Sequence, residues 1–152
     1  MRSIGVGVAM QPIWRKPPNI VVDGDCQAAG VGGWSVFHAG ALSKESDVFY
    51  PGRRSLKIPY DGSNTTGFAL QNGRFVAGHK YHCIVWFAGD GSARPWVSDD
   101  AYGGIHVGTN STALQLAEFE WTATGTKLFV GSDQFAAGRF VRLSNIWIWE
   151  VL

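Results

Sequence analysis

Four histidines supply the imidazole groups that acid–base catalysis and metal binding most often use near neutral pH. His79 and His82 are three positions apart in a strand-like segment, so their side chains are expected on opposite faces. The other two are His38 and His106, and the sequence contains no H-E-x-x-H motif, no G-x-S-x-G motif and no cysteine–histidine cluster. We therefore predict no catalytic residue and no zinc site.

Two pairs of carboxylates have residue types that could do the acid–base work of a glycosidase. Asp99 and Asp100 are neighbours in a stretch that we expect to form a solvated loop. Glu118 and Glu120 are two positions apart, which places both on one face of a strand, as in a polar outer face. Neither pair comes with the other groups that an active site requires, so we predict that the protein is not an enzyme.

Asp23 and Asp25 are candidate calcium ligands, because hard cations bind several carboxylate and carbonyl oxygens. An ordinary Asp-Gly turn explains the same residues, and we favour it. The fragment Gly5-Val6-Gly7 lacks the third glycine and the preceding strand of a dinucleotide-binding loop. We therefore expect neither a bound metal nor a cofactor.

Sugar binding requires flat aromatic rings flanked by polar groups. Five aromatic residues are candidates for such a platform: Trp34, Tyr60, Trp86, Trp96 and Tyr102. Trp34 and Trp86 lie in predicted strands, where a place in the core is the alternative. Trp96 and Tyr102 share a predicted loop with Arg94 and Asp99, and this loop is the best candidate for a glycan site. The alternative is that Pro95-Trp96 only anchors the loop to the body.

The composition indicates which scaffold must position these side chains. The chain has 152 residues, 45% hydrophobic and only 16% charged, with twenty Gly, nine Phe, seven Trp and four Tyr. This length suits a single folded body, and few charges with many aromatics exclude a disordered chain. The net charge of +1 argues against a general nucleic-acid binder, and no apolar run is long enough to span a membrane. An all-β domain with many turns is predicted.

The N-terminus lacks the long apolar segment and cleavage site of a secretory signal, so we expect synthesis in a reducing cytoplasm. Cys26 and Cys83 are too few for a disulfide scaffold and are expected to be free thiols. Cys83 lies in an alternating apolar run, which is typical of a buried side chain.

Residues 1–18 are predicted to form an extended N-terminal arm, and residues 19–152 the folded body. The arm has three basic residues and no acid, whereas the body has ten basic and twelve acidic residues. Pro17-Pro18 favours extended backbone. We expect the arm to dock on a partner, with a disordered leader as the alternative. The arm residues expected to bind are Arg2, Ile4, Val6, Val8, Met10, Ile13, Trp14, Arg15 and Lys16.

The body is predicted to consist of short strands separated by Gly-rich and Asn-Gly turns. Nine strands are predicted, over residues 19–23, 34–38, 55–60, 66–71, 81–88, 104–107, 114–121, 127–130 and 140–151. Apart from a weak candidate at residues 135–138, no segment has a helical period. About nine antiparallel strands at this spacing predict a sandwich or barrel.

Two predicted strands, at residues 81–88 and 146–151, are apolar on both faces. A strand in a solvated sheet needs only one apolar face. We therefore expect a loop, the arm or another subunit to cover the outer face, and a homo-oligomer is the favoured explanation.

Five short motifs follow one another along residues 19–150. They are Asn19-Ile-Val-Val-Asp-Gly-Asp25, Gly33-Trp34, Gly52-Arg-Arg-Ser55-Leu56, Gln71 with Gly78-His-Lys-Tyr81, and Leu143-Ser-Asn145-Ile146. In this order they resemble carbohydrate-binding modules of the family 4/9 type, which implies a galactose-binding-like jelly roll. The sequence departs from that family at Ser144-Asn145, which replaces an acidic residue linked to structural calcium, and at Cys26, which replaces a phenylalanine.

A small jelly roll with an N-terminal arm and no catalytic set also resembles bacteriophage head decoration (cement) proteins and tail-associated modules. We therefore expect a non-enzymatic virion structural protein, a capsid decoration protein. Its arm would bind the major capsid protein or another virion protein, and its body would form a homo-oligomer. The alternative is a carbohydrate-binding module, tail-associated or lectin-like, that stacks a glycan on exposed aromatics. Neither a nucleic acid nor a membrane is expected as a partner.

Overall fold

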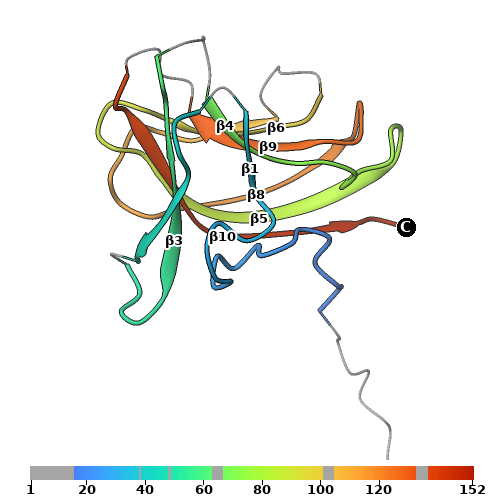
Figure 1. The fold of residues 1–152 in the computed structure, drawn as a ribbon. Coiled ribbons are helices and arrows are strands. Elements are labelled where there is room, and N and C mark those ends of the chain that lie inside the picture. The colour runs from blue at the N-terminus through green and yellow to red at the C-terminus, as the bar shows by residue number, and fades with distance from the viewer. Residues whose placement is uncertain (1–15, 38, 48, 63–66, 101–104, 133–136) are drawn as a thin grey trace, which may run out of the picture.

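The computed structural model describes residues 16–37, 39–47, 49–62, 67–100, 105–132 and 137–152. These residues contain ten strands in two antiparallel five-stranded sheets that pack face to face as a β-sandwich (Figure 1). They include no helix, and hence none that could cross a membrane. Half of the candidate helix at 135–138 lies outside the described residues, and residues 137 and 138 form a turn. The predicted all-β sandwich is confirmed.

The first sheet forms the upper layer in Figure 1 and the second sheet the lower layer. In order across the first sheet lie β1 (Ser35–Phe37), β4 (Gly67–Gln71), β9 (Leu128–Ser132), β6 (Pro95–Ser98) and β7 (His106–Val107). In order across the second lie β2 (Ser43–Ser46), β3 (Arg54–Pro59), β10 (Phe140–Glu150), β5 (Lys80–Ala88) and β8 (Gln115–Thr122).

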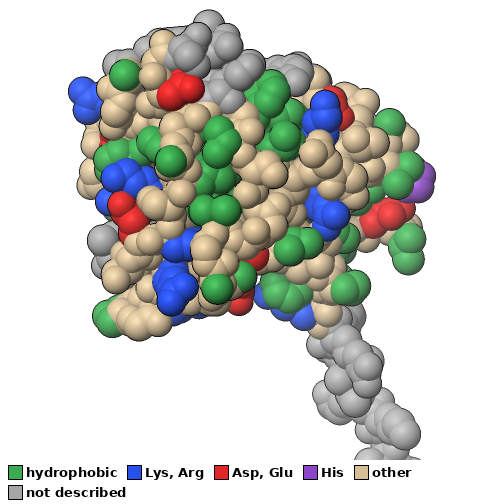
Figure 2. Space-filling model, in the orientation of Figure 1, with side chains coloured by type: hydrophobic (Ala, Val, Ile, Leu, Met, Phe, Trp, Pro, Cys, Tyr) green, Lys and Arg blue, Asp and Glu red, His purple; other side chains and the backbone are tan. Residues whose placement is uncertain are grey.

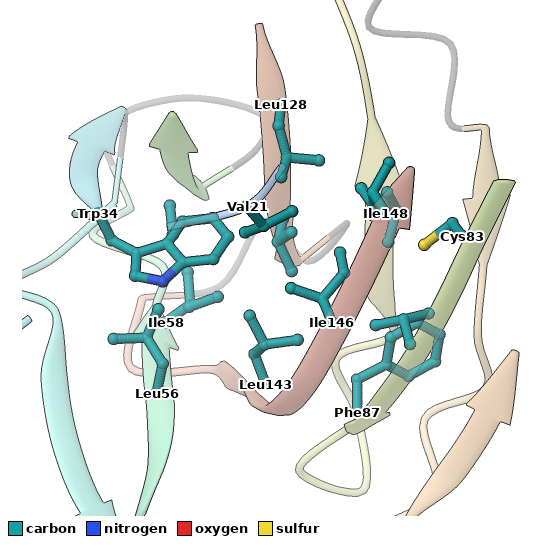
Figure 3. Packing of buried hydrophobic residues seen from close by; sticks show 14 of the residues in the cluster. Val21, Trp34, Leu56, Ile58, Cys83, Phe87, Leu128, Leu143, Ile146 and Ile148 are labelled. Atoms are coloured by element: carbon teal, nitrogen blue, oxygen red, sulfur yellow. The ribbon is translucent and has the colours of Figure 1, made fainter. Parts of the chain in front are cut away.

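The core lies between the sheets and is built from alternate residues of the strands. Apolar side chains of β3, β5, β9 and β10 meet there, and Val21 and Trp34 point into the same space (Figure 3). The Trp34 side chain is 3% exposed and Tyr60 is 4% exposed, so both belong to the interior. These two aromatics are therefore structural and do not form a sugar platform.

Most predicted strands form close to their expected positions, with three differences. Residues 19–23 make no strand, although they are β-branched and lie beside β10. Two strands were not predicted, because β2 has the polar sequence Ser-Lys-Glu-Ser and β6 begins at Pro95 in a stretch that was interpreted as a loop. The result is ten strands where about nine were expected.

The strand β10 changes partners halfway along its length. Its pairing with β3 ends at Leu143, and beyond that point residues 19–24 take the place of β3. Asn19 accepts a hydrogen bond from the Ile148 amide at 2.9 Å and donates one to the Ile146 carbonyl at 2.8 Å. The Ile20 amide donates to the Ile148 carbonyl at 3.0 Å, and the Ile146 amide donates to the Gly24 carbonyl at 2.7 Å. The Asn19 side chain and the backbone of Ile20 and Gly24 thus take the place of a neighbouring strand.

The same segment is also fixed to the first sheet. The Gln71 side chain of β4 accepts a hydrogen bond from the Val22 amide at 3.0 Å and donates one to the Val22 carbonyl at 2.6 Å. Between these attachments Val21 is buried in the core. Residues 19–24 therefore close one edge of the sandwich by bonding to both layers.

The end of the predicted arm also contacts the body. The Lys16 ammonium lies 3.4 Å from the Trp147 ring centroid, and the Trp147 indole N–H donates to the Pro17 carbonyl at 3.0 Å. Trp147 belongs to the outer face of β10, so this contact covers part of the apolar outer face that the sequence predicted. The arm residues 1–15 lie outside the described residues.

Replacing Asn19 by Ala should lower the free energy of unfolding by about 2 to 3 kcal/mol, because it leaves the Ile146 carbonyl and the Ile148 amide unpaired. Urea denaturation followed by tryptophan fluorescence measures this loss. Asn72→Ala, in an exposed turn, is the matched control and should change stability little. Equal effects of the two substitutions would show that Asn19 does not complete the sheet.

Candidate functional site

Four aromatic side chains lie together on the outer face of the first sheet, and we call them the aromatic face. They come from four neighbouring strands: Phe37, Phe68, Phe129 and Trp96. Phe129 lies with its ring centroid 5.3 Å from those of both Phe37 and Phe68. Phe68 is also 5.3 Å from Trp96. Because their strand neighbours such as Ala69 and Val130 point into the core, these rings must point the other way.

Gly131 lets Phe68 and Trp96 meet across an intervening strand. The register pairs Phe68 with Gly131 and Gly131 with Trp96, so the middle position has no side chain between the two rings. Phe68 and Phe129 are completely buried although they lie outside the sandwich core, whereas Trp96 is partly exposed. The buried Phe68 ring thus packs against the Trp96 ring, and Phe129 packs against Phe68 in turn.

Trp96 has an unused hydrogen-bond donor. Its indole nitrogen is buried and makes no hydrogen bond within the part of the chain that the structure describes. A buried N–H without a partner is costly, which makes it a natural donor for a ligand that reaches the site. The exposed part of the ring can stack on the flat face of a sugar, and a hydroxyl that enters beside it would find an unused donor.

The other residues of the predicted glycan site occupy different positions. Arg94 is exposed just before β6, two residues from Trp96. Asp99 is 2% exposed, and its carboxylate accepts hydrogen bonds from the Thr124 amide and hydroxyl, both at 2.9 Å. Asp99 therefore holds the turn after β8 and is unavailable to a surface ligand, which corrects that part of the prediction. Tyr102 lies outside the described residues.

Asp23 binds an internal cation, the ammonium of Lys44. The Lys44 nitrogen lies 2.5 Å from Asp23 Oδ2, 3.0 Å from the Cys26 carbonyl and 3.3 Å from the Ala28 carbonyl. The Lys44 and Asp23 side chains are 5% and 2% exposed. Asp23 and Cys26 both have positive φ, at 51° and 59°, which shapes this loop around the ammonium.

The Asp25 carboxylate takes no part in this arrangement, because it accepts a hydrogen bond from the Gln27 amide at the surface. No group of three or more His, Cys, Asp or Glu side chains among the described residues could hold a metal ion. The oxygen atoms that could bind calcium near Asp23 therefore already surround an ammonium group.

Lys44→Met should lower the free energy of unfolding by about 3 to 5 kcal/mol, because it leaves the buried Asp23 charge without its partner. Lys57→Met is the matched control, since Lys57 pairs with Glu45 at the surface and should contribute about 1 kcal/mol or less.

Thermal unfolding with and without EGTA tests whether calcium binds at this loop. The melting temperature of the wild-type chain should be the same in both, and a fall in EGTA would contradict an ammonium-filled site.

The carboxylates Glu118 and Glu120 both bind one imidazole on the outer face of the second sheet. His82 Nε2 lies 2.7 Å from Glu118, and His82 Nδ1 lies 3.2 Å from Glu120. Hydrogen bonds from Lys80 and then from His82 lower the pKa of the Glu120 carboxyl. A glycosidase acid requires a raised pKa, so Glu120 does not have the character of a catalytic acid.

The thiols of Cys26 and Cys83, which could act as nucleophiles, are both buried. Burial raises the pKa of the Cys26 thiol to about 12, and burial also raises the pKa of Cys83. Both cysteines are free, as predicted. His106 is stacked 5.0 Å from Phe119, and burial lowers its pKa, which favours a neutral packed ring. His38 lies outside the described residues.

Acidic and basic side chains are interspersed over the side of the molecule shown in Figure 2. No field of one sign covers that side, so it lacks the basic surface that a general nucleic-acid binder presents. The aromatic face is therefore the more informative feature of the surface.

Solved structures show where this fold occurs. The xylan-binding CBM22-1 domain of Paenibacillus barcinonensis Xyn10C matches with a TM-score of 0.64 and 10% identity, covering 89% of this chain and 96% of that one. TmCBM61 in complex with β-1,4-galactotriose matches with a TM-score of 0.58 and 12% identity, covering 88% and 99%. The enzymatically active domain of bacteriophage CBA120 tailspike protein 4 matches with a TM-score of 0.62 and 10% identity, covering 88% and 21%.

These matches establish the fold, a jelly-roll β-sandwich of the kind found in carbohydrate-binding modules. The chain spans about a fifth of the tailspike chain but nearly the whole of the two binding modules. No protein-family model matches the sequence, and no curated protein is significantly similar to it. The modules belong to families 22 and 61, whereas the sequence motifs resembled the 4/9 type.

Sequence reasoning missed three members of the aromatic face. Phe37, Phe68 and Phe129 were placed in strands without a functional role, because an apolar residue that points outward resembles one that points inward. The available signal was that β4 and β9 have apolar residues at consecutive positions, as in Phe68-Ala69-Leu70. Such a strand is covered on both faces.

Proposed function

We propose that this protein is a non-catalytic carbohydrate-binding module whose ligand lies on the aromatic face. The observation that carries the proposal is the Trp96 side chain, a partly exposed ring that packs against the buried Phe68 and whose indole N–H has no partner among the described residues. The similarity of the fold to xylan-binding and galactotriose-bound modules supports it.

A glycan chain suits this geometry better than a compact ligand. The aromatic face runs across four neighbouring strands, which lie about 4.8 Å apart, so its long direction exceeds the size of one sugar ring. Phe37 and Trp96, on the two outer strands of this set, are partly exposed and can stack on sugars, whereas Phe68 and Phe129 are completely buried between them. The rigid sheet holds the rings in place before binding, which lowers the entropic cost of association.

The role of Trp96 is testable by affinity electrophoresis in gels that contain soluble xylan, β-1,4-galactan or mannan. We expect at least one polysaccharide to retard the wild-type protein. Trp96→Ala should abolish that retardation, because it removes the stacking surface. Trp96→Phe should weaken binding about tenfold, because it keeps a ring but loses the N–H donor.

Trp121→Phe is the matched control, since the Trp121 indole nitrogen is also buried without a partner in the described part of the chain but packs against Phe75 and Tyr81. It should bind like the wild type. Full retardation of Trp96→Ala would show that the aromatic face is not the binding site.

A second candidate function is attachment to a virion as a capsid decoration protein. The observation that favours it is the contact of Lys16 and Pro17 with Trp147, which fixes the described end of the predicted arm on the outer face of the second sheet. That face also presents half-buried Ile84 and Trp149, which suit contact with a capsid protein or a second copy of the chain.

Deletion of residues 1–15 separates the two functions. The shortened chain should melt at the same temperature as the full chain, because the contacts of residues 16–24 remain. If the arm attaches the protein to particles, its deletion should abolish co-sedimentation with virus-sized particles in a density gradient. Unchanged co-sedimentation, or a full-length chain that never joins particles, would rule out attachment by the arm.

A further inference from the structure

A hollow lies on the outer face of the second sheet, on the opposite side of the sandwich from the aromatic face. It has a volume of about 260 Å³ and is lined by Tyr50, Arg53, Trp86, Ser144 and Asn145. We call it the Trp86 hollow. Trp86 points outward because its strand neighbours Val85 and Phe87 are buried in the core, and its ring is partly exposed.

The hollow is built by a bulge in β10. Leu143 pairs with Phe87 and Asn145 pairs with Trp86, so Ser144 is an extra residue in the ladder. The Ser144 hydroxyl donates to Asp47 Oδ2 at 2.6 Å, and both side chains are buried. The bulge thereby fixes the loop after β2 at the point where the sheet bends.

Asp47 shapes that loop from within. Its Oδ1 accepts hydrogen bonds from the amides of Phe49 at 2.8 Å and Tyr50 at 3.3 Å, and its own amide donates to the Arg53 carbonyl at 2.9 Å. The Arg53 amide in turn donates to the Tyr50 carbonyl at 3.1 Å. The backbone of Tyr50 and Arg53 is therefore fixed beside Trp86 through the buried Asp47 and Ser144 side chains, which gives the hollow a defined wall.

The polar groups of the hollow are available to a ligand. Arg53 makes no ion pair, and the Asn145 side chain makes no hydrogen bond, within the described residues. The Arg53 guanidinium carbon lies 5.9 Å from the Tyr50 ring centroid. The Asp47 carboxylate already accepts three hydrogen bonds from its own surroundings. The lining residues include no carboxylate, so no negatively charged side chain of the lining would repel an anion there.

We propose that the Trp86 hollow binds an acidic saccharide, a sugar that carries a carboxylate. The sugar ring stacks on Trp86, the carboxylate pairs with the Arg53 guanidinium, and the Asn145 amide bonds to a hydroxyl. Arginine suits this role because its planar fork matches a carboxylate in two parallel hydrogen bonds. This site is separate from the aromatic face, so it adds a second saccharide specificity to the proposed function.

The test is a titration of the full chain with sodium D-glucuronate. Binding is monitored through the indole N–H signals in ¹⁵N–¹H NMR spectra. Spectra of Trp86→Phe and Trp96→Phe assign the two relevant signals. We expect glucuronate to shift the Trp86 signal saturably and to leave the Trp96 signal unchanged. D-Glucose and sodium acetate, at equal concentration and ionic strength, should shift Trp86 much less.

Arg53→Gln should weaken glucuronate binding about tenfold or more, whereas Arg54→Gln, the neighbouring exposed arginine, should not change it. No shift of Trp86, equal binding of glucose, equal binding of acetate, or an unaffected Arg53→Gln variant would each overturn the proposal. A shift of Trp96 alone would place acidic sugars on the aromatic face instead. Loss of polysaccharide binding in Trp96→Ala is independent of all these results. Each of the two proposed sites can therefore be rejected without rejecting the other.

Discussion

The structure depends on how β10 satisfies its backbone hydrogen bonds. This strand runs through the middle of the second sheet. Its pairing with β3 on one side ends at Leu143 of β10. Beyond that residue, the buried backbone around Ile146 and Ile148 needs other donors and acceptors. Asn19, Ile20 and Gly24 provide them, and the same segment bonds to Gln71 of the first sheet. A short irregular segment thus completes one sheet and ties it to the other.

The change of partner in β10 also explains the two faces of the molecule. The Ser144 bulge occurs next to the point where β3 ends, and it binds the Asp47 loop that forms one wall of the Trp86 hollow. On the opposite sheet, regular pairing of β4, β9 and β6 brings rings into register around Gly131. One face is therefore shaped by an irregularity and the other by strict alternation, and both present an aromatic ring beside unpartnered polar atoms.

The electrostatics of the sandwich suit binding better than catalysis. Its charged groups are mostly paired with one another: Lys44 with Asp23 inside, and His82 and Lys80 with Glu118 and Glu120 outside. The thiols are buried and held protonated by their surroundings. The described residues of the two candidate sites offer rings, an amide and a guanidinium, groups that recognise a sugar without transferring a proton to it.

The sequence was sufficient for the features that depend on local periodicity. The strands β5 and β10 were predictable because their side chains alternate over nine and eleven residues. The four polar residues of β2 have no such period, and Pro95 obscured β6. Residues 19–23 look like a strand because Ile20, Val21 and Val22 are β-branched, but half of the hydrogen bonds from residues 19–24 to β10 come from the Asn19 side chain. No local pattern predicts that pairing.

The candidate sites show the same limit. Trp96 was identifiable from its polar surroundings, but Phe68 and Phe129 were not, because only the sheet register shows that they point outward. Trp86 was interpreted as a strand residue whose alternative was the core, and only the burial of its neighbours assigns its direction. The pairing of Lys44 with Asp23 joins residues 21 positions apart, a distance at which sequence spacing is uninformative.

The most direct test of the account is a crystal structure of the chain with the oligosaccharide unit of whichever polysaccharide retards it most. The account predicts an intact sugar chain on the aromatic face, with one ring stacked on Trp96 and a hydroxyl bonded to its indole N–H. A sugar bound only along the rim of the sandwich, or one cleaved during the experiment, would contradict the assignment of this face as a non-catalytic binding site.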